Sequence, residues 1–137
     1  GKVIKSPKGW GIGRHTYEIK ACPNWMSDCP ATISVGVSHQ DQVVVLPPGA
    51  AILAASDFTP MAAIDYGSTP AMSFQCHPEF SVEYCAALYA IRKGGALSEE
   101  AVDAAIRAPM ESRFCWFSMF SVPGKRSLSS STSSVAR

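Results

Sequence analysis

The sequence has little charge and no long hydrophobic run. Only 17% of its 137 residues are charged, and its uninterrupted apolar stretches are a handful of residues long. A helix that spans a bilayer needs roughly 20 consecutive apolar residues, so no membrane role is predicted. The chain opens with Gly1 rather than Met, and residues 6–9 (SPKG) are unlike the apolar core of a signal peptide. We expect it to be part of a longer protein.

The sequence also lacks a basic region in its main part. Residues 1–112 carry eight basic and eleven acidic residues, whereas residues 113–137 carry four basic residues and no acidic one. A net charge of −3 over the main part does not suit phosphate neutralisation, so nucleic-acid binding by the folded part is not predicted. The basic end either contacts anions weakly or is a solvated tail without a partner.

No C-x-x-C pair and no zinc-ligand spacing occurs, which argues against a metal site, and no cofactor is predicted. Five cysteines form an odd set, and a chain of this length can fold without disulfides. A reducing, cytoplasmic location therefore fits best, although Cys22 and Cys29 could bridge a loop in an oxidising setting. The cysteines are Cys22, Cys29, Cys76, Cys85 and Cys115.

The hydrophobic content of 47% suits one domain of this length, which buries roughly two-thirds of its unfolded surface. Short β-rich runs, separated by Pro, Gly and Asp, predict strands followed by helices. The last run, 71–75, has the composition of a strand buried on both faces. The predicted strands are 13–20, 33–37, 43–46, 52–55, 62–66 and 71–75.

Two helices are predicted after the strands. The first begins near Ser81, a suitable N-cap, and ends at the glycines 94–95. Its buried stripe is formed by Val82, Cys85, Ala86 and Tyr89. The second opens at residues 98–100 and ends at Pro109, and its buried side is formed by Val102, Ala105 and Ile106.

The composition changes after the second helix. We expect residues 1–109 to form the domain and residues 110–137 to form an aromatic and then Ser-rich tail, partly disordered because serines bury little surface. The aromatic cluster of the tail either packs back on the domain or is an exposed patch that binds a partner. A frame-shifted reading would also give such a tail. The cluster comprises Phe114, Trp116, Phe117, Met119 and Phe120.

The segment FQCHPEF at 74–80 joins the last strand to the first helix. Pro78 keeps His77 out of the helical region, which could let the imidazole of His77 and the carboxylate of Glu79 turn toward each other. A carboxylate on one imidazole nitrogen leaves the other nitrogen to accept a proton from a nucleophile. A satisfied polar pair at a strand end is the alternative interpretation.

Four further segments precede this one: GWGIG at 9–13, SHQDQV at 38–43, LPPGA at 46–50 and AASD at 54–57. Together with His-Pro-Glu, and in this order, they resemble the class I glutamine amidotransferases, in particular the glutaminase domain of GMP synthase. The resemblance covers about residues 1–107. It implies an α/β, flavodoxin-like domain, present here in part, with a mixed sheet and flanking helices.

The resemblance implies that glutamine is hydrolysed to glutamate and ammonia, which passes to an acceptor synthetase domain or subunit. His77 would be the general base and Glu79 would orient it. Ser38, His39, Gln40 and Asp41 would shape the glutamine pocket, although His39 to Asp41 could equally be a hairpin turn.

The family's nucleophile is a cysteine on a Gly-rich strand-to-helix turn, and no cysteine of this chain has that context. Cys76 precedes His77, but adjacent residues of an extended segment point to opposite sides, so a buried structural role is predicted for it. The resemblance thus implies that only the carboxyl-terminal part of the domain is present, that the amino-terminal half is missing, and that the chain alone is inactive and prone to associate. A non-catalytic interaction or regulatory module and a related γ-glutamyl hydrolase are the alternatives.

Overall fold

The computed structural model describes residues 1–26, 29–69 and 71–108. Within these residues the chain forms strands first and two helices last, in the predicted order. The elements are β1 (Lys2–Lys5), β2 (Gly11–Ile19), β3 (Thr32–His39), β4 (Asp41–Val45), β5 (Ala51–Ala55), β6 (Ala63–Asp65), β7 (Met72–Phe74), α1 (Val82–Arg92) and α2 (Glu99–Arg107).

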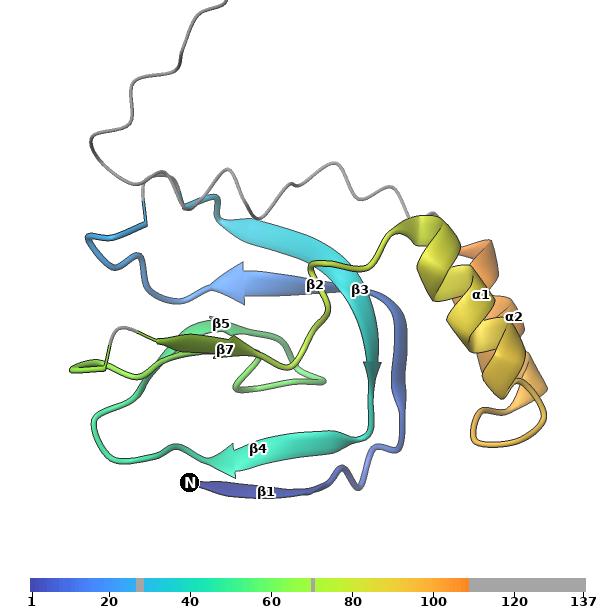
Figure 1. The fold of residues 1–137 in the computed structure, drawn as a ribbon, viewed down its shortest axis with the longest axis horizontal. Helices are drawn as coiled ribbons and strands as arrows, with labels where there is room; N and C mark the ends of the chain where they lie inside the picture. Colours follow the sequence, from blue (N-terminus) through green and yellow to red (C-terminus); the bar gives the residue numbers. More distant parts are fainter. Residues whose placement is uncertain (27–28, 70, 109–137) are drawn as a thin grey trace, which may run out of the picture.

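The strands form two sheets (Figure 1). The larger has the order β3-β2-β5-β6-β7, and its neighbouring strands are antiparallel. The smaller is the pair β1 and β4, with Val3 opposite Val43. The sequence did not predict β1, whose four residues are all exposed, because its partner strand lies about 40 residues away in the chain.

Strands β3 and β4 follow one another but belong to different sheets. Gln40 separates them, and its carbonyl accepts a hydrogen bond from the Ser6 backbone N–H at 2.8 Å. The alternative of a hairpin at residues 39–41 is therefore wrong. The chain turns from one sheet into the other at this point because β4 pairs with β1 rather than with β3.

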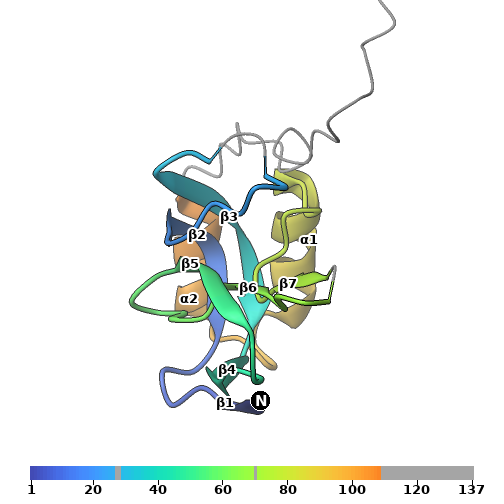
Figure 2. The same cartoon turned by 90° about the vertical axis from the view of Figure 1, so that its left-hand side faces the viewer.

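The core consists of two clusters of buried side chains. The helices cover one side of the β2–β3 pair, and strands β5 to β7 lie toward the other side (Figures 1 and 2). The first cluster contains Tyr17 and Val35 from this pair and Leu53 and Ile64 from β5 and β6. The second lies under the helices and contains Cys85, Tyr89, Leu97, Val102 and Ala105. Strands β2 and β3 pack against a core cluster on each of their two faces, and they are the longest strands of the described chain.

The helices begin and end where their capping residues predict. Ser81 Oγ accepts a hydrogen bond from the Tyr84 N–H at 3.1 Å, and Ser98 Oγ accepts one from the Ala101 N–H at 3.2 Å. Gly94, with a φ of +72°, turns the chain after α1. The predictions that Val82 and Ile106 are buried are wrong: these residues are 37% and 44% exposed. No helix of the described residues is long and apolar enough to cross a membrane.

Strand β7 differs from its prediction. It is an edge strand of three residues that pairs with β6, and all three residues are only half-buried. In the described chain, where β6 is its one neighbour in the sheet, this strand is therefore not buried on both faces. The apolar composition that suggested such burial came from residues that face the first core cluster, among them Met72 and Phe74.

The cysteines of the long β2–β3 connection are joined. Cys22 and Cys29 form a disulfide across a Cα–Cα distance of 5.9 Å. The expectation that a reducing setting would keep these thiols free is thus contradicted. The other two cysteines in the described chain, Cys76 and Cys85, are free and buried, as predicted for Cys76.

Candidate active site

His77 lies in the connection from β7 to α1, and its backbone is fixed against β3. The N–H of His77 donates to the Gly36 carbonyl at 2.9 Å, and the Phe80 N–H donates to the His77 carbonyl at 3.1 Å. The second bond closes a turn around Pro78, so His77 and Glu79 are presented on a short, braced loop. The loop lies beside Gly36, in the middle of β3.

Gly36 allows this approach. A Cβ atom at this position would come within 2.8 Å of Cys85 Sγ and 3.7 Å of Phe80 Cβ. A side chain would push α1 and the His77 loop away from β3, because a carbon and a sulfur atom cannot approach so closely. The absence of a side chain at Gly36 therefore lets the loop dock.

The side chains of His77 and Glu79 meet directly. His77 Nδ1 lies 2.8 Å from Glu79 Oε1, and the two side chains are 33% and 59% exposed. No other hydrogen bond of the described residues involves the His77 ring. With Nδ1–H donating to the carboxylate, Nε2 is left as the basic nitrogen.

Phe80 holds the plane of the imidazole. The rings of Phe80 and His77 are stacked with centroids 4.0 Å apart and an interplanar angle of 4°. Phe80 in turn contacts Tyr84 of α1 at 4.6 Å. Sequence reasoning did not assign a role to Phe80; its position directly after Glu79 was the available signal.

The contact with His77 also affects the ionisation of Glu79. Partial burial acts to raise the pKa of Glu79, but the hydrogen bond from His77 and a backbone hydrogen bond outweigh it and lower the pKa. Glu79 is therefore a carboxylate at neutral pH, which is the form that orients an imidazole.

The four residues predicted to shape a glutamine pocket occupy the end of β3 and the start of β4. Ser38 Oγ accepts a hydrogen bond from Arg92 at 2.9 Å, and Gln40 Oε1 accepts one from Lys5 at 3.1 Å. Asp41 starts β4, and its backbone carbonyl lies 3.1 Å from His39 Nδ1. None of the four makes a hydrogen bond to His77 or Glu79 within the described chain.

Of these four residues, His39 is the one whose pKa is affected by His77. Burial lowers the pKa of His39, the carbonyl of Asp41 acts against this, and the charges of His15 and His77 lower the pKa further. The backbone of His77 forms an isolated bridge with Gly36, three residues before His39 in the same strand. The buried Nε2 of His39 has no hydrogen-bond partner among the described residues.

The free thiols of the described chain do not have the features of a nucleophile. Burial raises the pKa of Cys76 to about 12, and burial also raises the pKa of Cys85. A thiol attacks as its thiolate, which these surroundings disfavour. Among the described residues, no group of three or more His, Cys, Asp or Glu side chains could hold a metal ion.

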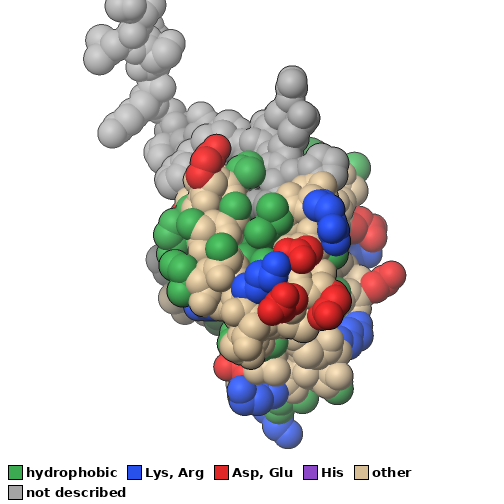
Figure 3. Space-filling view, turned by 90° about the vertical axis from the view of Figure 1, so that its right-hand side faces the viewer, with side chains coloured by type: hydrophobic (Ala, Val, Ile, Leu, Met, Phe, Trp, Pro, Cys, Tyr) green, Lys and Arg blue, Asp and Glu red, His purple; other side chains and the backbone are tan. Residues whose placement is uncertain are grey.

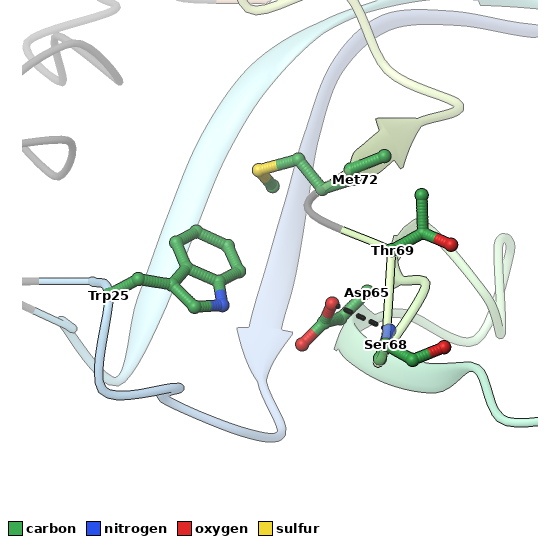
Figure 4. A pocket seen from close by; sticks show the side chains of 7 residues that line it. Trp25, Asp65, Ser68, Thr69 and Met72 are labelled. Atoms are coloured by element: carbon green, nitrogen blue, oxygen red, sulfur yellow. Dashed lines mark hydrogen bonds between the residues drawn. The ribbon is translucent and has the colours of Figure 1, made fainter.

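A separate pocket of about 510 Å³ lies beside β7 (Figure 4). Trp25 and Met72 form its apolar wall, and Asp65 accepts a hydrogen bond from the Gly67 N–H at 3.0 Å. The remaining lining residues are Gly67, Ser68, Thr69 and Ala71. None of the predicted site residues lines this pocket.

Comparison with protein families matches residues 1–86 to the model described as "Glutamine amidotransferase class-I". The chain belongs to this family. The match includes the His-Pro-Glu segment and every strand of the described fold. Comparison with curated protein sequences finds no match.

Solved structures have the same fold as this amidotransferase chain. A glutamine amidotransferase from Thermotoga maritima is 20% identical, with a TM-score of 0.62 over 77% of this chain and 45% of its own. One from Methylobacillus flagellatus is 23% identical, with a TM-score of 0.60 over 82% and 46%. A protein assigned as a GMP synthase subunit, from Thermoplasma acidophilum, is 21% identical, with a TM-score of 0.53 over 66% and 51%. The chain spans about half the length of these structures.

Proposed function

We propose that this chain carries the base and the orienting carboxylate of a glutamine-hydrolysing amidotransferase site. The contact between His77 Nδ1 and Glu79 Oε1 at 2.8 Å supports the proposal most directly. An imidazole that is one-third exposed, with one nitrogen on a carboxylate and the other without a partner in the described chain, is suited to proton transfer.

In the proposed reaction, a thiolate attacks the side-chain amide carbon of glutamine after His77 Nε2 takes the proton of the thiol. His77 then gives this proton to the leaving nitrogen as the C–N bond breaks, which releases ammonia and leaves a thioester. Water, deprotonated by the same nitrogen, attacks the thioester and releases glutamate. Glu79 keeps the proton on Nδ1 throughout and stabilises the imidazolium.

The attacking thiol is proposed to come from outside the described residues. Cys76 and Cys85 are buried with raised pKa values, and Cys22 and Cys29 are joined to each other. The fifth cysteine of the chain, Cys115, lacks the Gly-rich context of the family's nucleophile, so we expect this chain by itself not to hydrolyse glutamine. The other half of the site would come from a part of the family's domain that these residues do not include.

The segment Ser38 to Asp41 is proposed to border the glutamine site through His39. The bridge between the backbones of Gly36 and His77 supports this placement, because His39 ends the same strand three residues after Gly36. Arg92 holds Ser38, and Lys5 holds Gln40, so these two side chains would fix the shape of the segment. We further propose that residues 1–109 form the domain unit and that ammonia passes to a synthetase domain or subunit, by analogy with the neighbour assigned to GMP synthase.

The test is ammonia release from glutamine by the gene product that carries this chain. His77→Ala should lower kcat/KM roughly 10²- to 10⁴-fold, the range of general acid–base catalysis. Glu79→Gln should lower it in the same direction, and Glu83→Gln, the same chemical change four residues later on an exposed site, should not. Full activity of the His77→Ala variant would contradict the proposal. Hydrolysis by this chain alone would overturn the external origin of the thiol.

A further inference from the structure

Helix α1 is apolar on two opposite sides. Its buried side contains Cys85 and Tyr89. Its outer side carries a second stripe at positions i, i+3, i+4 and i+7, formed by Tyr84, Ala87, Leu88 and Ile91. Only Glu83 and Arg92 of the eleven residues are charged. A helix that is apolar all round is normally covered on both sides.

The outer stripe of α1 is exposed to solvent at Tyr84, Ala87 and Ile91 in the described chain, whereas Leu88 is half-buried. Ile91 is 83% exposed and Tyr84 is 53% exposed. Figure 3 shows apolar side chains gathered over the α1 side of the molecule and charged side chains over the neighbouring side. The neighbouring helix α2 has a charged outer side instead, with Glu99, Glu100 and Arg107 exposed.

We propose that residues 114–120 of this chain (FCWFSMF) cover the outer stripe of α1. Five of the seven residues of this segment have large apolar side chains: Phe114, Trp116, Phe117, Met119 and Phe120. Burying them against an apolar surface of similar length would stabilise the chain. The charged outer side of α2 does not provide one, whereas the α1 stripe does.

The chain is long enough to make this connection. The two helices lie side by side and are joined at one end by the turn at 93–98, so α2 ends where α1 begins (Figure 1). The six residues 108–113 reach up to about 20 Å when extended. The stripe from Tyr84 to Ile91 is only about 10 Å long. The aromatic segment can therefore lie along the whole stripe.

The charges are also compatible. Glu83 is exposed in the first turn of α1, at the end of the helix that the segment reaches first. Arg113 directly precedes the aromatic cluster, and residues 113–137 contain no acidic residue. Docking would bring Arg113 toward Glu83, and residues 114–120 themselves carry no charge that would be placed against the apolar stripe.

The experiment follows the solvent exposure of Trp116 in the full chain. The other two tryptophans of the sequence are removed as Trp10→Phe and Trp25→Phe, so that Trp116 is the remaining tryptophan. Acrylamide quenching of Trp116 should be several-fold weaker than that of free tryptophan. Ile91→Asp should raise quenching to the free level. Ile106→Asp, at an exposed isoleucine of α2, is the matched control and should leave it unchanged.

Far-UV circular dichroism establishes whether each variant is folded. If Ile91→Asp does not fold, Ala87→Glu serves as a second variant of the outer stripe. Light scattering gives the molar mass in the same samples. Quenching of Trp116 at the free level in the parent chain overturns the proposal, and so does an equal response to Ile91→Asp and Ile106→Asp. If Trp116 is protected only in a dimer, and Ile91→Asp abolishes both the dimer and the protection, a second copy of the chain covers the stripe. That result would also overturn the proposal.

Discussion

At the scale of single residues, the close approach at Gly36 is the feature that places His77. We expect Gly36→Ala to lower the free energy of unfolding by about 1–3 kcal/mol, because the new methyl group would overlap Cys85 Sγ. Urea denaturation measures this loss. Gly95→Ala, where an added Cβ meets only the Arg92 carbonyl at 3.7 Å, is the control. The double variant Gly36→Ala/Cys85→Ala should recover part of the loss; an additive effect would show that the overlap is not its cause.

The carboxyl group of Glu79 provides a second residue-scale prediction. Its hydrogen bond to His77 outweighs partial burial and lowers its pKa below the ordinary 4.5. In the His77→Ala variant this bond is lost, so the pKa of Glu79 should rise. A titration of the side-chain carboxyl carbons by NMR measures both values. Because the folded pKa is lowered, the stabilisation from this pair is present above about pH 4.5 and is lost as the pH falls through the folded pKa. An unchanged pKa in His77→Ala would show that the pair is not formed.

At the scale of elements, the hydroxyl group of Tyr89 joins α1 to two strands. It accepts a hydrogen bond from the Gly13 N–H at 2.9 Å and donates one to the Val37 carbonyl at 2.6 Å, and the side chain is fully buried. Tyr89→Phe should lower the free energy of unfolding by about 1–3 kcal/mol, since it leaves buried backbone groups unpaired. Tyr84→Phe, at a half-exposed position of the same helix, should change it little. Equal small effects in thermal or urea denaturation would contradict this role.

What the sequence predicted at this scale was local. The start of α1 at Ser81 and its end at Gly94 depend on residues within a turn of each boundary, and both predictions are confirmed. The contact between His77 and Glu79 is likewise local, because Pro78 restricts the backbone between them. The pairing of β1 with β4 and the Cys22–Cys29 disulfide depend on distances set by the whole fold. The contact of Gly36 with the loop was missed for the same reason. The stacking of Phe80 on His77 is local, and it was missed because no role was assigned to Phe80 from the sequence.

At the scale of the whole molecule, two half-buried histidines should make the stability of the domain depend on pH near neutrality. His15 and His39 both lie near Phe58, with ring centroids 5.1 Å and 6.2 Å from it. Burial lowers the pKa of both, and hydrogen bonds to backbone groups, of Ile12 for His15 and of Asp41 for His39, only partly oppose it. At a pH near the ordinary pKa of histidine, the unfolded chain therefore binds more protons than the folded chain does.

Because the folded pKa values of these histidines lie below the ordinary 6.5, stability is greatest above pH 7 and declines as the pH falls through 6.5, levelling off below the folded pKa values. Midpoints of urea denaturation from pH 8 to pH 5 measure this decline. The double variant His15→Gln/His39→Gln should flatten it. Glu83→Gln should not, since the pKa of Glu83 is lowered and its titration lies below this range. A midpoint that stays constant from pH 7 to pH 5 in the parent chain would mean that these imidazoles are protonated as readily in the folded chain as in the unfolded one.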